Sequence, residues 1–182
     1  MFNSIRRTIA AASALALGLG GALWATSAAS AAPAAVPACS TGSLAVWVNL
    51  SAGGVAAGTV WFPLDFTNIG RRACTLLGYP SVAATNVDGG QLGRAAEREL
   101  APKPTTVTIP AGGTAHAYLL WLDVGNFPSG CKPGTASLLK VYPPGQRSAA
   151  RAFFSLPVCL TTTPLYQSLF VTVLQPGVAH AL

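Results

Sequence analysis

The sequence lacks the motifs that carry the common enzyme chemistries. It has no G-x-S-x-G nucleophile elbow, no H-E-x-x-H zinc motif and no Asp/Asn-rich calcium loop. Its two histidines, His116 and His180, are far apart in the chain, so they supply no obvious set of metal ligands. We therefore predict that the protein is not an enzyme and needs no metal or cofactor.

Acidic side chains are also scarce, with five Asp and Glu residues against eleven Lys and Arg residues in 182. The acids are Asp65, Asp88, Glu97, Glu99 and Asp123. A glycosidase pair of carboxylates normally lies in a deep cleft, for which a chain of this length offers little room. The basic residues are scattered, with no dense stripe and no interleaved aromatics, which disfavours nucleic acid as a partner.

The first 31 residues have the pattern of an export signal. Arg6 and Arg7 form a positive segment, Thr8–Trp24 is apolar and uncharged, and Ala29–Ala31 is a small-x-small cleavage site. A retained membrane anchor is the alternative, but the stretch is built of Ala, Gly and Ser rather than Leu and Ile. We predict cleavage before Ala32 by the general secretory route rather than the twin-arginine route. The product is secreted, with no stable membrane insertion.

Short apolar runs separated by Gly, Pro and Asn predict strands throughout the rest of the chain. The clearest is Thr59–Thr67, where apolar residues recur at every second position and Trp61 falls on the opposite face, either exposed or covered by further chain. Pro63 lacks a backbone donor, so an unpaired edge or a bulge is expected beside it. The predicted strands are Leu44–Leu50, Thr59–Thr67, Ser81–Val87, Thr105–Ile109, Thr114–Val124, Ser137–Tyr142, Ala149–Leu156 and Ser168–Leu174.

Turn-forming residues recur between these strands, at 68–70, 88–90, 110–113 and 143–145. Helical periodicity is missing after the signal, although Gln91–Leu100 is expected to form one or two helical turns. Many short strands joined by turns predict an all-β sandwich. The domain layout is then an Ala/Pro-rich leader at 32–38, a single domain at 39–177 and a frayed tail at 178–182.

Four cysteines remain after cleavage, Cys39, Cys74, Cys131 and Cys159, and none forms a C-x-x-C pair. An even number in an exported chain predicts two disulfides, for which three connectivities exist. If the strands at 44–50 and 59–67 are antiparallel neighbours, Cys39 meets Cys74. If the strands at 137–142 and 149–156 form a hairpin, Cys131 meets Cys159. Each bond closes a loop of about 30 residues and stabilises the fold by about 3–4 kcal/mol.

The stretch FTNIGRRACTLLGYP combines several unusual residues, and most have a structural role as a corner between strands. Asn68–Gly70 ends a strand, with Gly70 expected at positive φ, and Cys74 pins the loop that follows. Only Arg71 and Arg72 have no such role. Paired arginines at a turn are usually solvated, but they are also candidates for binding an anionic polymer or a protein partner.

The same stretch resembles a known family. Together with DGGQLG at 88–93, TIPAGGTAHAYL at 108–119, Cys131 and LLKVYPPG at 138–145, it is similar to the exported actinobacterial family named domain of unknown function 4232. The resemblance covers about Cys39 to Gly177 and includes all four cysteines. It implies a secreted or cell-envelope β-sandwich, often immunoglobulin-like, and it implies no activity. The lipobox and polar linker of many relatives are missing here.

We therefore predict a secreted, non-catalytic interaction domain whose partner is an extracellular protein or a cell-wall polymer. A carbohydrate-binding module is one alternative, in which Trp61 and a neighbouring aromatic side chain are exposed together. A protease inhibitor is another, with Lys132 in the sequence CKPG presented beside a disulfide. The candidate binding residues are Trp61, Arg71, Arg72 and Lys132, and the wider set of aromatic candidates is Trp47, Tyr79, Tyr118, Trp121 and Tyr142.

Overall fold

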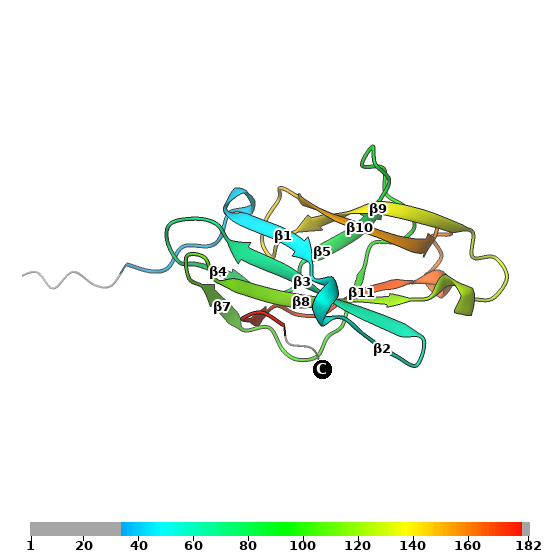
Figure 1. Ribbon diagram of the computed structural model, residues 1–182, viewed down its shortest axis with the longest axis horizontal. Coiled ribbons are helices and arrows are strands. Elements are labelled where there is room, and N and C mark those ends of the chain that lie inside the picture. The colour runs from blue at the N-terminus through cyan, green and yellow to red at the C-terminus, as the bar shows by residue number, and fades with distance from the viewer. Residues whose placement is uncertain (1–33, 180–182) are drawn as a thin grey trace, which may run out of the picture. The chain divides into compact units, whose positions relative to one another are not determined.

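The structure is a computed structural model that describes residues 34–179, so the predicted signal peptide at 1–31 lies outside the described residues. The described part is all-β, with four short 3-10 turns and the strands coloured along the chain in Figure 1. The turns are η1 (Thr41–Ser43), η2 (Leu50–Ala52), η3 (Val124–Asn126) and η4 (Pro164–Tyr166). The strands are β1 (Leu44–Val48), β2 (Gly54–Ala56), β3 (Thr59–Asn68), β4 (Cys74–Leu77), β5 (Ser81–Thr85), β6 (Glu97–Arg98), β7 (Thr106–Ile109), β8 (Thr114–Leu122), β9 (Pro133–Tyr142), β10 (Ala150–Cys159), β11 (Leu169–Val171) and β12 (Gln175–Pro176).

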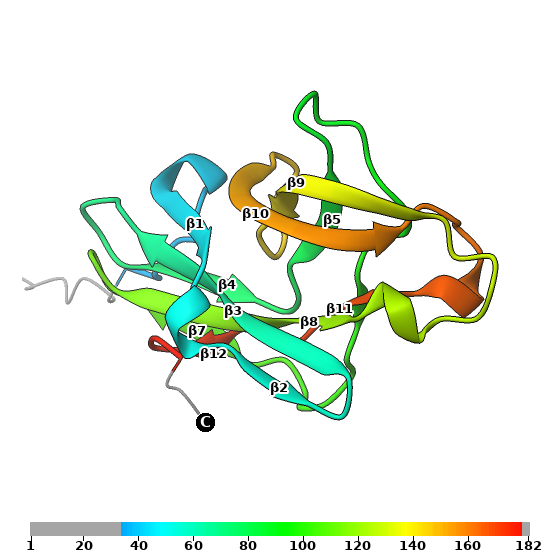
Figure 2. The same cartoon turned by 45° about the vertical axis from the view of Figure 1, so that its right-hand side comes forward.

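Two main sheets face each other as a sandwich, which confirms the predicted fold class. The larger sheet has the order β1-β3-β8-β11-β6, with β2 also pairing β3 and β12 also pairing β8. The smaller sheet has the order β10-β9-β5, and β4 pairs β7 in a separate two-stranded ladder. Figure 2 shows β9 and β10 as one layer above β3 and β8 as the other.

The core forms where the alternating apolar residues of both sheets point inward. In the β3–β8 ladder the large side chains Leu64 and Phe66 lie opposite the small Ala117 and Ala115, and all four are fully buried. Pairing large with small residues lets the inner faces interdigitate at high density. Burying a side chain such as Leu64 or Phe66 stabilises the fold by about 2–3 kcal/mol.

Two side chains of the larger sheet tie it directly to the smaller one. Phe62 of β3 meets Phe154 of β10 edge to face, with ring centroids 4.9 Å apart. Trp121 of β8 packs against the core, and its Nε1 donates a hydrogen bond of 2.7 Å to the carbonyl of Pro157. Trp121, one of the aromatic binding candidates, therefore belongs to the core stripe of its strand.

Pro63 sits at an interruption in strand pairing, as expected for a residue without a backbone donor. β1 pairs β3 from Leu64 onward and β2 pairs β3 up to Trp61, so the partner strand changes beside Pro63. Its carbonyl accepts a hydrogen bond from the Asn49 backbone N–H at 2.8 Å. The nitrogen and the carbonyl of one strand residue point to the same edge of the strand, so the Pro63 nitrogen lies in the gap between β2 and β1.

The predicted helix at Gln91–Leu100 is wrong, because this segment has no helical turn and its residues 92–96 hydrogen-bond to β5. The backbone N–H groups of Leu92 and Ala96 donate to the carbonyls of Ala84 and Val82, at 2.8 Å each. Further along, β6 pairs β11 in parallel. These inter-strand bonds satisfy the backbone groups that a helix would have paired internally.

Both predicted disulfides are confirmed. Cys39 is bonded to Cys74 and Cys131 to Cys159, and no cysteine is free among residues 34–179. Cys39 and Cys74 meet because β1 and β3 are antiparallel, as predicted. Leu44 lies opposite Asn68, so the residues before β1 lie close to those that follow β3. The β9–β10 hairpin likewise brings the residues around Cys159 to the start of β9.

Candidate functional site

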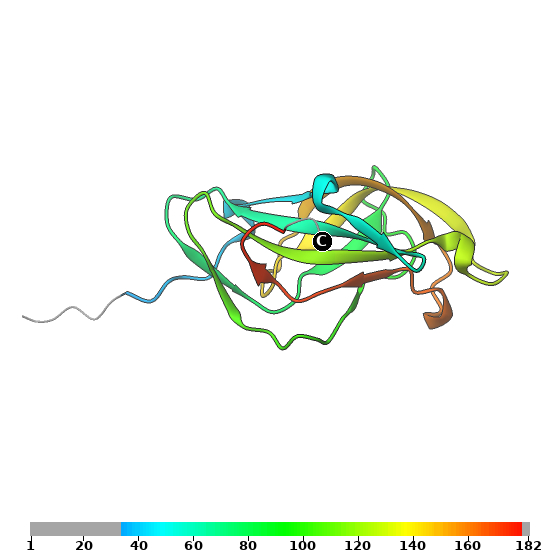
Figure 3. The same cartoon turned by 60° about the horizontal axis from the view of Figure 1, so that its bottom comes forward.

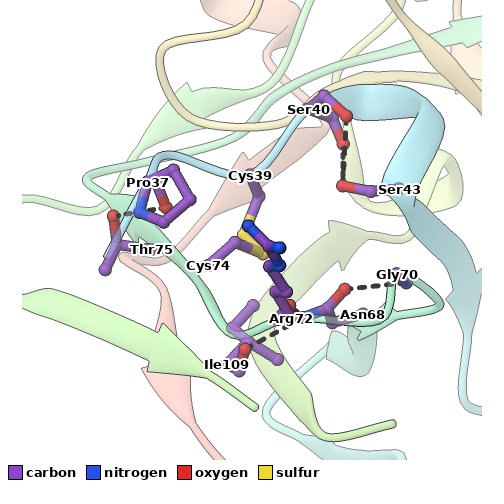
Figure 4. The surroundings of a disulfide bond; sticks show 10 residues. All are labelled: Pro37, Cys39, Ser40, Ser43, Asn68, Gly70, Arg72, Cys74, Thr75 and Ile109. Atoms are coloured by element: carbon purple, nitrogen blue, oxygen red, sulfur yellow. Dashed lines mark hydrogen bonds between the residues drawn. A yellow bond between two sulfur atoms is a disulfide. The ribbon is translucent and has the colours of Figure 1, made fainter. Parts of the chain in front are cut away.

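The corner around the Cys39–Cys74 disulfide is organised by the side chain of Asn68, which is fully buried. Its Nδ2 donates to the carbonyls of Arg72 at 2.8 Å and Ile109 at 3.0 Å, and its Oδ1 accepts from the Gly70 N–H at 2.9 Å (Figure 4). Gly70 does not have the positive φ that was expected of it, so that prediction is wrong. The turn is made by the Asn68 side chain rather than by a left-handed glycine.

Arg71 and Arg72 are both exposed at this corner. They line a shallow depression of about 330 Å³ together with Pro37, Asn68 and Cys74. Pro37 and the residue after it are held to β4, because the Pro37 carbonyl accepts a hydrogen bond of 2.8 Å from the Thr75 N–H. The two guanidinium groups face solvent, so a role in binding an anionic polymer stays a prediction.

Lys132 is exposed at the Cys131–Cys159 end of the domain. Its carbonyl accepts a hydrogen bond of 2.7 Å from the Leu160 N–H, and its own N–H donates to Thr161 Oγ1 at 3.3 Å. The peptide groups of Lys132 are therefore engaged with the chain that follows β10. This arrangement gives no specific support to an inhibitory loop, which would present its main chain to a protease.

Trp61 lies half-buried on the outer face of the larger sheet, the face turned toward the viewer in Figure 3. Its indole lies across Gly54 of β2, where a Cβ atom would overlap the ring. Pro63 and Asp65, the next residues on this face, are buried. The outer face was expected to be either exposed or covered by further chain, and the structure shows it partly covered. Trp61 lies at the part of this face that stays open.

Two depressions adjoin on this outer face, and we call them together the outer-face site. The first has a volume of about 240 Å³ and is lined by Trp61, Tyr118, Leu120 and Thr172. The second has a volume of about 440 Å³ and is lined by His116, Tyr118 and residues 175–179. Tyr118 belongs to both, so the site passes from an apolar end to a polar end along β8.

The sheet register explains why these residues meet. Trp61 lies directly opposite Leu120, and Pro63 lies opposite Tyr118. Thr172 completes the apolar end, since the Tyr118 N–H donates to Thr172 Oγ1 at 2.8 Å and the Thr172 N–H donates to the Tyr118 carbonyl at 3.0 Å. These paired strands hold the aromatic rings in place before any ligand arrives, which reduces the entropy lost on binding.

The polar end adjoins a buried pair of titratable residues, Asp65 and His116, which lie opposite each other across β3 and β8. Asp65 Oδ2 accepts a hydrogen bond from Asn49 Nδ2 at 3.2 Å, while the buried Oδ1 has no hydrogen-bond partner. Burial raises the pKa of Asp65 above its ordinary value, against opposing effects of Asn49 and His116. His116 Nδ1 lies 2.9 Å from the Gly177 carbonyl, and its ring meets Tyr118 edge to face.

Metal ligation and membrane insertion are two further possibilities for residues 34–179. No group of three or more His, Cys, Asp and Glu side chains converges there as a metal site requires. Nor does any helix in this part of the chain have the length and apolar character needed to cross a membrane. The outer-face site itself is built from aromatic, hydroxyl, imidazole and main-chain groups, which can stack and hydrogen-bond with a ligand.

The fold and this site define a small β-sandwich domain with two disulfides and an aromatic depression on one sheet. Residues 39–175 match the family described as Domain of unknown function (DUF4232), and the chain belongs to this family. The resemblance noted from the sequence is thereby confirmed. No curated protein and no solved structure matches the chain.

Proposed function

We propose that the mature chain is a secreted, non-catalytic interaction domain of the extracellular space or cell envelope, and that it binds its ligand in the outer-face site. Export by the signal peptide at 1–31 and an immunoglobulin-like arrangement of the sandwich are parts of this proposal. Two disulfides support it, because such bonds persist mainly in oxidising compartments.

The observation that carries the proposal is the placement of Trp61 and Tyr118 in one apolar depression on a preformed sheet. Aromatic side chains contribute large contact areas and lose little conformational entropy on binding, so they dominate many binding surfaces. The larger of the two adjoining depressions, about 440 Å³, has the volume of a small-ligand site, and the smaller one, about 240 Å³, extends it.

A carbohydrate segment of a wall polymer is the ligand class that the two ends of the site favour. A sugar ring has an apolar C–H face that can stack on Trp61 or Tyr118, and hydroxyl groups that need polar partners. Such partners stand at the other end, where His116 and Gln175 line the larger depression. An extracellular protein inserting an apolar side chain is the second candidate, favoured by the mainly apolar side chains that line the smaller depression.

Co-sedimentation and pull-down with the mature chain, residues 32–182, test this proposal. The chain is incubated with the insoluble cell-wall fraction and, separately, with culture supernatant proteins. We expect binding to the wall fraction, and Tyr118→Ala and Trp61→Ala should each weaken it about tenfold, as loss of a central aromatic contact does. The matched control is Phe153→Ala, because Phe153 is 87% exposed on β10, in the other sheet.

Equal binding by all four proteins would overturn the assignment of the site. Because Trp61 also packs over Gly54, each variant is first compared with the parent protein by thermal unfolding. Leu120→Lys provides a third test at the same depression, since a charge there opposes stacking. Loss of binding in a variant that unfolds at the parent temperature supports the site directly.

A further inference from the structure

Two basic side chains lie side by side on the outer face of the smaller sheet. Lys140 of β9 and Arg151 of β10 are direct cross-strand partners, and both are exposed. Like charges placed opposite each other in an antiparallel ladder repel, so this arrangement does not help the fold. It does concentrate positive charge at one place, as the adjacent Arg71 and Arg72 do at the Cys39–Cys74 corner.

The two side chains line a depression of about 270 Å³ with Thr85, Asp88 and Gly89, together with Ala149. The turn after β5 forms one wall of it, and the Asn86 side chain fixes that turn by accepting a hydrogen bond of 2.7 Å from the Gly90 N–H. A Cβ atom at Gly89 would lie 3.9 Å from the guanidinium of Arg151, so the turn is close to that group. The depression is therefore walled by backbone on one side and by cations on the other.

Neither cation forms an ion pair with another residue in the described range 34–179. Among residues 34–179 the ion pair found is Arg94 with Glu97, at 2.8 Å, and it involves neither Lys140 nor Arg151. Asp88 is the acid that lines the depression, and it forms no ion pair with either of them. Lys140 Nζ lies 5.5 Å from the centre of the Tyr142 ring, which orients the ammonium group without cancelling its charge.

We propose that this depression binds an oxyanion, a phosphate or carboxylate group carried by an anionic extracellular polymer. Arg151 supplies the planar fork of donors that suits an oxyanion, and Lys140 supplies a compact point charge beside it. The site lies on the smaller sheet and shares no residue with the outer-face site, so it rests on the proposed extracellular location but not on binding at the outer-face site.

A charge series on the mature chain tests this site, with binding measured by titration against a soluble glycerol-phosphate polymer and, separately, polygalacturonate. Arg151→Gln and Lys140→Gln should each weaken binding about fivefold or more, as loss of a charge-assisted contact does. Asp88→Asn should strengthen binding, because it removes a negative charge from the rim. The matched control is Arg147→Gln, which removes the same charge from an exposed residue that does not line the depression.

The two polymers distinguish a phosphate source from a carboxylate source, and binding of either that follows the charge series supports the site. Two results would overturn it. One is an equal effect of Arg147→Gln and Arg151→Gln, which would mean attraction by net charge alone. The other is that neither polymer binds the parent protein at low salt. All four side chains are exposed, so these substitutions leave the core intact.

Discussion

Replacing Gly93 with alanine should destabilise the domain far more than replacing Gly112, although both glycines have left-handed backbones. Their φ angles are 66° and 74°. A Cβ atom at Gly93 would overlap the carbonyl oxygen of Cys159 at the end of β10, whereas one at Gly112 meets nothing within 4 Å. The difference between the two variants therefore isolates the close contact between the 91–96 segment and β10.

The expected magnitudes follow from separate contributions. An alanine in the left-handed region costs about 1–2 kcal/mol, and the loss of glycine freedom in the unfolded chain offsets about 0.4–1 kcal/mol. Gly112→Ala should then lower the free energy of unfolding by about 1.5 kcal/mol or less. Gly93→Ala must also displace a main-chain carbonyl, and such overpacking adds about 1–3 kcal/mol. We expect a total loss of about 2–4 kcal/mol for Gly93→Ala.

Urea unfolding of the parent and the two variants measures these differences, provided that the m-values agree. Thermal unfolding gives an independent check, since 1 kcal/mol shifts the midpoint by about 4 °C in a domain of this size. If Gly93→Ala and Gly112→Ala are equal within about 0.5 kcal/mol, the segment does not pack against β10 as described.

Other substitutions test the corner and the buried acid. Removing the first disulfide as Cys39→Ala/Cys74→Ala should cost about 4 kcal/mol of unfolding free energy for a sequence separation of 35, measured in urea. Asn68→Ala leaves three main-chain groups without their partner and should cost about 2–4 kcal/mol in the same assay, whereas no change would show that the corner forms without it. Asp65→Asn should raise stability at pH 7, because burial raises the pKa of Asp65 above its ordinary 3.8 and so penalises the ionised form. The stability advantage of Asp65→Asn should shrink as the pH falls through the folded-state pKa of Asp65, because the native protein takes up the proton before the unfolded chain does. An advantage that stays constant with pH would contradict this account.

Much of the fold could be predicted because long strands carry a strong periodic signal. The alternation in β3 identified its inner and outer faces, and antiparallel pairing of β1 with β3 then gave the Cys39–Cys74 bond. Strands β2, β6 and β12 were missed because two or three residues are too few to show a period. The four residues of β4 were hidden in a stretch interpreted as loop around Cys74.

The sites were harder to predict because they depend on register between strands far apart in sequence. Trp61 was a candidate from its own strand, but nothing local indicates that Leu120 lies opposite it. The same holds for Lys140 and Arg151, which meet only through the β9–β10 pairing. Asn68 was interpreted as a turn residue, whereas its carboxamide also reaches the Ile109 carbonyl, 41 residues away.

Hydroxyl-radical footprinting of the mature chain, with and without solubilised wall polymer, tests the proposed binding face most directly. Trp61 and Tyr118 are partly exposed at the outer-face site, and Phe153 is 87% exposed in the other sheet as an internal reference. We expect oxidation of Trp61 and Tyr118 to fall on addition of polymer while oxidation of Phe153 stays constant. Unchanged oxidation of both site residues at a polymer concentration that saturates binding of the protein would contradict binding at the outer-face site.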